Sequence, residues 1–297
     1  MIGMHTPLFI FGATGFVGRN LLAGLASRGY RVTCLVRDAA GAELVGRYGA
    51  SAVIGDVLEP ETYRTAIPPG SQVLYLIHAL GPQVPRGKFS DLDRRAAALM
   101  LPACRQAGVR RIIHLGGLGD ATEKLSRHLA SRAEVSRMIS DSGLPAAILR
   151  ASIIFGTDSA SYEILRAALK LPVVPLPPWR NTRVQPIAIQ DVIRCLFGTL
   201  AHPDLTGLFD IGGPAVYTYG ELLRTLAAAL GLSRKFFNIP VEARAFAALL
   251  LSQLSGVGVG ETPALLQSLE NTSIVPGENA ISTVFGFEPT PVLARVR

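Results

Sequence analysis

The chain has 297 residues, a formal net charge of +7 and 49% hydrophobic residues. This length and apolar content favour one large α/β domain or two coupled lobes, and exclude a mainly disordered or collagen-like chain. The longest apolar run, residues 245–251, is far shorter than the roughly 20 residues of a membrane span. Cys34, Cys104 and Cys195 are odd in number and far apart, which excludes a disulfide framework. With no signal-peptide pattern at the N-terminus, we expect a cytoplasmic protein.

The excess positive charge is confined to the first half of the chain. Residues 1–150 carry 18 basic and 11 acidic side chains, whereas residues 151–297 carry 11 of each. The arginines are scattered, without long basic runs or interleaved aromatic residues, so nucleic acid is not expected as a partner. Because arginine suits bidentate contacts to phosphate, the charge favours a phosphorylated ligand bound by the first half.

The chain begins with the pattern of a strand, a glycine-rich turn, a helix and a second strand. An apolar run at residues 7–11 precedes the sequence GATGFVG at residues 12–18. Apolar residues then recur with helical spacing up to Leu25, and a second strand is predicted at residues 31–36. This succession within about 30 residues is the context that a dinucleotide-binding turn requires.

Each glycine of this turn has a physical role. Gly12 permits the tight turn, Gly15 lets the backbone approach a pyrophosphate, and Gly18 lets the helix pack close to the strand. The start of the helix adds free N–H groups and the positive end of the helix dipole. The sequence therefore predicts a site for a dinucleotide at this turn.

The glycine turn and the segments after it resemble the short-chain dehydrogenase/reductase superfamily in its extended or atypical branch. The resemblance implies an α/β fold, a Rossmann doubly wound parallel sheet with a smaller C-terminal substrate lobe. It implies an NAD(P)-binding core at residues 1–156, completed by about 184–213, and a smaller lobe at residues 157–183 and 214–297. The matching segments after the turn are Gly55-Asp56-Val57 and residues 73–79, 111–119, 146–156, 184–192 and 209–214.

The turn and the resemblance together imply contacts to the cofactor from the loops after the strands. A metal site is not expected, because His78 and His114 are isolated histidines in apolar strands. The expected cofactor contacts are Gly12, Thr14, Gly15, Phe16, Val17, Gly18, Arg37, Asp56, Val57, Ile77, His78, Ala79, Leu115, Gly116, Arg132, Ala151 and Ile153.

The end of the second strand indicates which dinucleotide is bound. Arg37 follows this strand at the place where an arginine accommodates the 2′-phosphate of NADP, and Arg19 could reach the same group. Asp38 comes next, and an acidic residue in that place would accept from the ribose hydroxyl of NAD. We expect NADP, with NAD as the alternative.

The catalytic signature of the superfamily, Tyr-x-x-x-Lys, is missing. His128 stands where the tyrosine would be and Arg132 where the lysine would be. The strand end that usually carries a serine or threonine reads Gly116-Gly117. His128 could act as a general acid, and Arg132 could hold ribose hydroxyls or a phosphate, so both are candidate catalytic residues.

The second half predicts a substrate lobe. Residues 172–179 contain four prolines and are expected to form an extended loop. Trp179, Arg180 and Arg183 are candidate substrate contacts, and Asp191 is expected to cap the helix that follows it.

Two further helices are indicated in this half. Thr218 and Glu221 have the spacing of a capping box before a helix that ends near Gly231. Residues 243–254 are apolar nearly all round, which predicts a buried helix or one that faces a homodimer or another protein partner. Peripheral contact with a membrane is the alternative.

Two functions remain open on the sequence. One is an NADP-dependent oxidoreductase, or an epimerase/dehydratase-like enzyme for nucleotide sugars, that acts on a small-molecule substrate with non-standard catalytic residues. The other is a non-catalytic NADP(H) sensor, regulator or accessory subunit, similar to NmrA-like regulators or the NADPH-binding accessory subunit of respiratory complex I.

Overall fold

The computed structural model describes residues 6–78, 89–119, 124–240, 253–255 and 266–295. Its centre is a seven-stranded sheet in which all neighbouring strands are parallel. The expected α/β fold with a doubly wound parallel sheet is therefore confirmed. The strand order is β11 (Gly207–Ile211), β6 (Ala146–Ala151), β5 (Arg111–Gly117), β4 (Gln72–Tyr75), β1 (Leu8–Phe11), β2 (Val32–Val36) and β3 (Ser51–Ile54).

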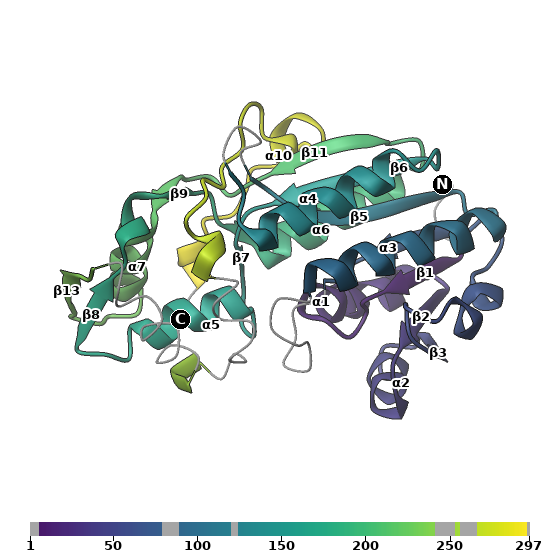
Figure 1. Cartoon of the computed structure of the whole chain (residues 1–297), viewed down its shortest axis with the longest axis horizontal. Helices are drawn as coiled ribbons and strands as arrows, with labels where there is room; N and C mark the ends of the chain where they lie inside the picture. The colour runs from purple at the N-terminus through teal and green to yellow at the C-terminus, as the bar shows by residue number, and fades with distance from the viewer. Residues whose placement is uncertain (1–5, 79–88, 120–123, 241–252, 256–265, 296–297) are drawn as a thin grey trace.

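The central strands are continuous apolar runs because both faces of the sheet are covered. In β1, Leu8 and Ile10 pack in one core, whereas Phe9 and Phe11 pack in the core on the opposite face. Helices α1 (Phe16–Leu25) and α6 (Ile189–Ala201) cover the first face. Helices α3 (Phe89–Gln106) and α4 (Arg127–Ser140) lie side by side on the other face, as Figure 1 shows. Helix α2 (Ala39–Gly46) connects β2 to β3.

A second core lies beside the sheet, at the left of Figure 1. It is built largely from two amphipathic helices and a pair of parallel strands, so this part of the chain buries its own apolar side chains. The division of the chain at the expected lobe boundaries stays a prediction. The elements outside the large sheet are β7 (Ile154–Phe155), α5 (Ala160–Ala168), β8 (Val173–Leu176), β9 (Arg183–Val184), β10 (Ile187–Ala188), β12 (Tyr217–Thr218), α7 (Tyr219–Ala229), β13 (Lys235–Asn238) and α10 (Ala280–Thr283).

Two local expectations were wrong. The proline-rich segment is not simply a loop, because its first part forms β8, which pairs in parallel with β13. Asp191 does not cap α6, which begins two residues earlier. It is buried in the first turn, where its carboxylate accepts from the backbone N–H of Thr290 at 2.5 Å and from the Thr290 hydroxyl at 3.0 Å.

The apolar segment at residues 243–254 lies outside the described residues, except for its last two positions. Within the described ranges, no helix has the length and hydropathy needed to cross a bilayer.

Candidate functional site

The glycine turn after β1 has the geometry of an anion-binding site. Gly12 has φ of +85°, and a Cβ there would lie 2.9 Å from the carbonyl carbon of Leu76, so only glycine fits. Gly15 caps α1 without a side chain, which leaves the N–H groups of the first helical turn open to a ligand. At Gly18, a Cβ would lie 2.5 Å from the carbonyl oxygens of Gly12 and Ala13. These features fit a dinucleotide pyrophosphate.

A cavity of about 360 Å³ opens at this turn. Its walls come from the carboxyl ends of β4, β5 and β6, from α4 and from the second core, which is where open parallel sheets bind ligands. The expected cofactor and catalytic residues that line it are Gly12, Gly15, Phe16, Val17, Gly18, His78, Leu115, Gly116, His128, Arg132, Ala151 and Ile153.

Other expected contacts do not line this cavity. Thr14 is in the turn itself, and Ile77 is in the segment after β4. Asp56 and Val57 follow β3 on the same edge of the sheet, where the Asp56 carboxylate accepts from the N–H of Leu58 at 2.8 Å. Ala79 lies outside the described residues.

The residues expected to distinguish NADP from NAD differ in the hydrogen bonds that they already make within the chain. Arg37 is exposed directly after β2. Asp38 caps α2, where its carboxylate accepts from the N–H of Gly41 at 2.8 Å. The guanidinium of Arg19 donates to the carbonyl oxygen of Thr14 at 2.8 Å, which ties it to the glycine turn. The carboxylate that could favour NAD therefore already has a structural role.

Arg132 and Ser136 of α4 occupy the space beside the two glycines at the end of β5. A Cβ on Gly117 would lie 3.3 Å from Cδ and Nε of Arg132, and a Cβ on Gly116 would lie 2.7 Å from Oγ of Ser136. The Arg132 guanidinium donates to the carbonyl oxygen of Leu115 at 2.5 Å. A larger side chain at Gly117 would therefore press against Arg132.

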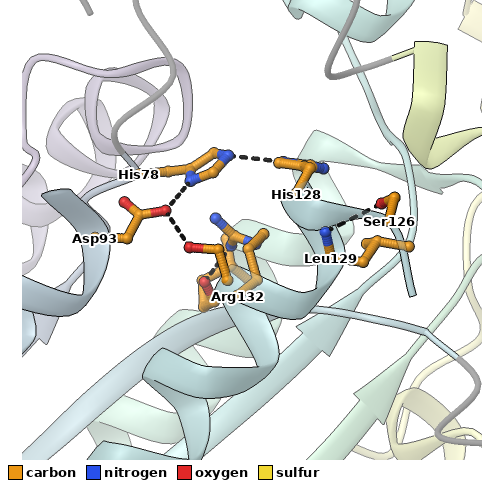
Figure 2. Close-up of polar contacts among 8 residues, drawn as sticks. His78, Asp93, Ser126, His128, Leu129 and Arg132 are labelled. Carbon is orange, nitrogen blue, oxygen red and sulfur yellow. Dashed lines mark hydrogen bonds and ion pairs between the residues drawn. The ribbon is translucent and has the colours of Figure 1, made fainter. Parts of the chain in front are cut away.

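His128 belongs to a hydrogen-bonded chain that we call the histidine network, formed by Asp93, His78, His128 and Ser131. Figure 2 shows His78 between Asp93 and His128. Nδ1 of His78 lies 3.0 Å from Oδ2 of Asp93, and Nε2 of His78 lies 2.7 Å from Nε2 of His128. The hydroxyl of Ser131 donates to the same Asp93 oxygen at 2.9 Å. The network joins the segment after β4 to helices α3 and α4.

Burial governs the charge of this network. It lowers the pKa of His128 well below its ordinary value, and the nearby His78 and Arg132 lower it further. Burial also lowers the pKa of His78, although the hydrogen bond to Asp93 opposes the shift. Burial lowers the pKa of Arg132 as well, but a guanidinium stays charged. Both histidines are therefore neutral at pH 7.

Several residues of the site could not be predicted from the sequence. Asp93 and Ser131 were missed because an acidic residue or a serine on an amphipathic helix usually faces solvent, and only the packing of α3 on α4 buries them. Ser152, Ser159 and Tyr219 also line the cavity without a motif that marks them. Conversely, Trp179, Arg180 and Arg183 do not line it, and Trp179 is buried in the second core.

Known proteins resemble this chain over most of its length. A family model described as NAD(P)H-binding matches residues 12–173, more than half of the chain. The chain belongs to this family. The matched range of this chain includes the glycine turn, the four residues of the histidine network and Arg132.

Relatives of this NAD(P)H-binding chain include NADH dehydrogenase (ubiquinone) 1 alpha subcomplex subunit 9, mitochondrial, from Mus musculus. It is 26% identical over 295 residues, which cover 95% of this chain and 76% of the relative. A ceramide reductase from Caulobacter vibrioides is 25% identical over 93% of this chain and 89% of its own length. The fold is similar to that of the Citrobacter sp. triphenylmethane reductase complexed with NADP(H), with a TM-score of 0.73, 18% identity and coverage of 97% and 98% of the two chains.

Proposed function

We propose that this chain is an NADPH-dependent reductase of neutral, largely apolar carbonyl compounds, with His128 as the proton donor. The observation that carries the proposal is that His128 and Arg132 line the same cavity as the glycine turn. Among the described lining residues, Arg132 is the one with a fixed charge. The lining from residue 154 onward is uncharged and consists of Ile154, Ser159, Ala160, Ser161, Tyr219, Ser268, Leu269 and Ser273. Such a wall suits an apolar substrate better than the diphosphate of a nucleotide sugar.

The residues of the chain would divide the chemistry as follows. NADPH supplies hydride to a carbonyl carbon when it is bound, and the carbonyl oxygen then needs a proton. His128 would donate this proton, because its imidazole lines the cavity at the glycine turn and can carry a hydrogen on either ring nitrogen. Oγ of Ser152 is buried in the cavity wall without a partner among the described residues, and would hold the carbonyl oxygen. Arg132, fixed on Leu115, would hold the ribose hydroxyls or a phosphate of the cofactor.

The preference for NADPH rests on the end of β2. Arg37 is exposed there, while the carboxylate of Asp38 is used as a helix cap. A free guanidinium beside the adenosine ribose favours a 2′-phosphate.

The relatives support both this function and its alternative. One relative over most of the chain is a ceramide reductase by name, which is consistent with an apolar substrate. Another is a subunit of a mitochondrial NADH dehydrogenase, at 26% identity over 95% of this chain. That likeness favours the alternative of a non-catalytic NADPH-binding subunit or sensor, for which a homodimer or another protein would be the partner.

Measuring NADPH turnover distinguishes the reductase from the non-catalytic subunit or sensor. Purified chain is mixed with NADPH and a panel of long-chain ketones, quinones and nucleotide sugars, and NADPH oxidation is followed by its absorbance. We expect turnover of an apolar ketone or quinone, and a fall in kcat of about 10²–10⁴-fold for His128→Asn. His202→Asn is the matched control, because His202 is an exposed histidine at the end of α6 that does not line the cavity. Tight NADPH binding without any turnover would refute the reductase and favour the sensor.

A further inference from the structure

The histidine network brings together three parts of the chain that are distant in sequence. His78 follows β4, Asp93 is in α3 and His128 is in the first turn of α4. Asp93 is 2% exposed and His128 is 9% exposed, so their hydrogen bonds are sheltered from water. We propose that Asp93 and His78 form a proton relay that fixes the tautomer of His128 and replaces the proton it gives away. This inference rests on the proposed reductase function.

The tautomers follow from the donors and acceptors along the chain of hydrogen bonds. The carboxylate of Asp93 can only accept, so Nδ1 of His78 carries a hydrogen that it donates to Oδ2. In neutral His78, Nε2 then has only a lone pair and must accept from Nε2–H of His128. Nδ1 of His128 is left without a hydrogen, and it is buried without a partner among the described residues. Asp93 thereby selects which nitrogen of a second histidine is free.

One added proton converts this arrangement into a donor. In the proposed relay, Nδ1 of His128 takes up one proton from water in the cavity that this residue lines, and the hydrogen on Nε2 of His128 moves to Nε2 of His78. The positive charge then lies on His78, directly beside the carboxylate of Asp93, and His128 is neutral with its hydrogen on Nδ1. On delivery, the Nδ1–H bond of His128 breaks and an O–H bond forms on the substrate. The hydrogen on Nε2 of His78 returns to His128, which restores the neutral pair.

The surroundings explain why the carboxylate is needed. Arg132 from the same helix opposes a positive charge on either histidine, and His114 from β5 adds no opposite charge because it is neutral. Tyr75 from β4 is also neutral, since burial raises its pKa. Among the described groups that face the pair, Asp93 is the one that favours the extra proton. Ser131 holds the Asp93 oxygen in place from α4.

A metal site would not give this geometry. Two imidazole nitrogens bound to one tetrahedral zinc ion, each about 2.0–2.1 Å from the metal, lie roughly 3.3 Å apart. The two Nε2 atoms here are 2.7 Å apart, which is a hydrogen-bond distance. Within the described part of the chain, no group of three or more His, Cys, Asp or Glu side chains is arranged to hold a metal ion.

The tautomers can be read without any substrate. The full chain is labelled with ¹⁵N in its imidazole rings, and two-bond ¹H–¹⁵N spectra are recorded at neutral pH, with signals assigned through single His→Gln variants. We expect His78 to be protonated on Nδ1 and His128 on Nε2 in the wild-type chain. A wild-type spectrum with His78 protonated on Nε2 would overturn the relay, even if a variant failed to fold.

Variants then test the carboxylate. In Asp93→Asn, the neutral amide can accept or donate, so both histidines should become mixtures of tautomers. Ser131→Ala is the matched control, because it removes the other hydrogen bond to the same oxygen and keeps the carboxylate, so the tautomers should stay unchanged. Unchanged signals in Asp93→Asn, or equal changes in both variants, would overturn the proposal.

Kinetics supply the second readout. Asp93→Asn should lower kcat roughly ten- to a hundredfold. As the pH is raised, kcat of Asp93→Asn should begin to fall at a lower pH than kcat of the wild-type chain. The reason is that the histidine pair loses the negative carboxylate that favours its added proton. The Kd of NADPH should stay within twofold. A loss of NADPH binding in proportion to kcat would show a merely structural role. If no substrate is found, the reductase proposal fails by itself, whereas the ¹⁵N spectra still decide the tautomers.

Discussion

The glycine turn and the histidine network face the same cavity, but the chain encodes them differently. The turn occupies seven consecutive residues, 12–18. Backbone atoms leave no room for a Cβ at Gly12, beside Leu76, or at Gly18, beside the carbonyl oxygens of Gly12 and Ala13. The network takes side chains from residues 78, 93, 128 and 131, which meet only when α3 and α4 pack on the sheet. A backbone motif can therefore be recognised in a sequence, while a side-chain network assembled by packing cannot.

This difference has a consequence for substitutions. Changes in the turn alter backbone sterics and should affect folding or nucleotide binding directly. Changes in the network alter protonation and should leave the nucleotide affinity almost unchanged. Substitutions in the turn should therefore have larger effects on stability and affinity than substitutions at single exposed or buried side chains.

Gly18→Ala should destabilise the fold by about 3 kcal/mol, since its Cβ would overlap two backbone carbonyl oxygens that cannot move away. The free energy of unfolding is measured by urea titration. Gly46→Ala in α2 is the control, because a Cβ there meets nothing within 4 Å and should change stability by less than about 1 kcal/mol. Equal stability of the two variants would show that α1 does not pack on the turn as described.

Gly15→Val should weaken NADPH binding by about 100-fold, or about 2.7 kcal/mol, while the protein stays folded. Gly15 has φ of −71°, which valine tolerates, and its Cβ would meet only the carbonyl oxygen of Gly12 at 3.3 Å. The new side chain would occupy the space of the pyrophosphate. Calorimetric titration gives the affinity, with Gly277→Val as a control at an open, exposed position. Retained binding would refute the pyrophosphate site.

Arg37→Ala should weaken NADPH binding about tenfold, or about 1.4 kcal/mol, and leave NADH binding within twofold. The loss arises because one charge-assisted contact to the 2′-phosphate disappears. Arg47→Ala is the control, since Arg47 is an exposed arginine that pairs with Glu43 at 2.6 Å. Equal losses for NADPH and NADH would rule out the role of Arg37.

His114 should make the fold sensitive to acid. Burial lowers its pKa from 6.5 to about 3, so the unfolded chain takes up a proton at mildly acid pH that the folded chain does not. The contribution of neutral His114 to the free energy of unfolding is therefore fully present above pH 6.5 and is lost as the pH is lowered towards 3. For this group the loss is about 1 kcal/mol between pH 6.5 and 5.5. The free energy of unfolding is measured by urea titration at pH 6.5 and pH 5.5. Its decrease between the two pH values should be about 1 kcal/mol smaller in His114→Gln than in the wild-type chain. An equal decrease in both chains would show that His114 is not the group responsible.

Several features could be predicted from the sequence because their causes are local. The capping box of Thr218 and Glu221 forms as expected, with both reciprocal hydrogen bonds in place at the start of α7. His128 and Arg132 were placed correctly on one helix, and both line the cavity. In contrast, Asp191 has the residue type of a helix cap, yet its partner is Thr290, 99 residues away.

The parallel α/β architecture and the glycine turn could be predicted from the sequence alone, because apolar runs, helical spacing and a compact glycine motif involve residues close together in the chain. The sequence also places His128 and Arg132 where the superfamily that it resembles has its tyrosine and lysine. What these two side chains contact depends on the packing of the folded chain. Burial of Asp93 between α3 and α4 is favourable only when a partner such as His78 compensates the lost hydration of the carboxylate, and that partner reaches it through the packing of the whole sheet.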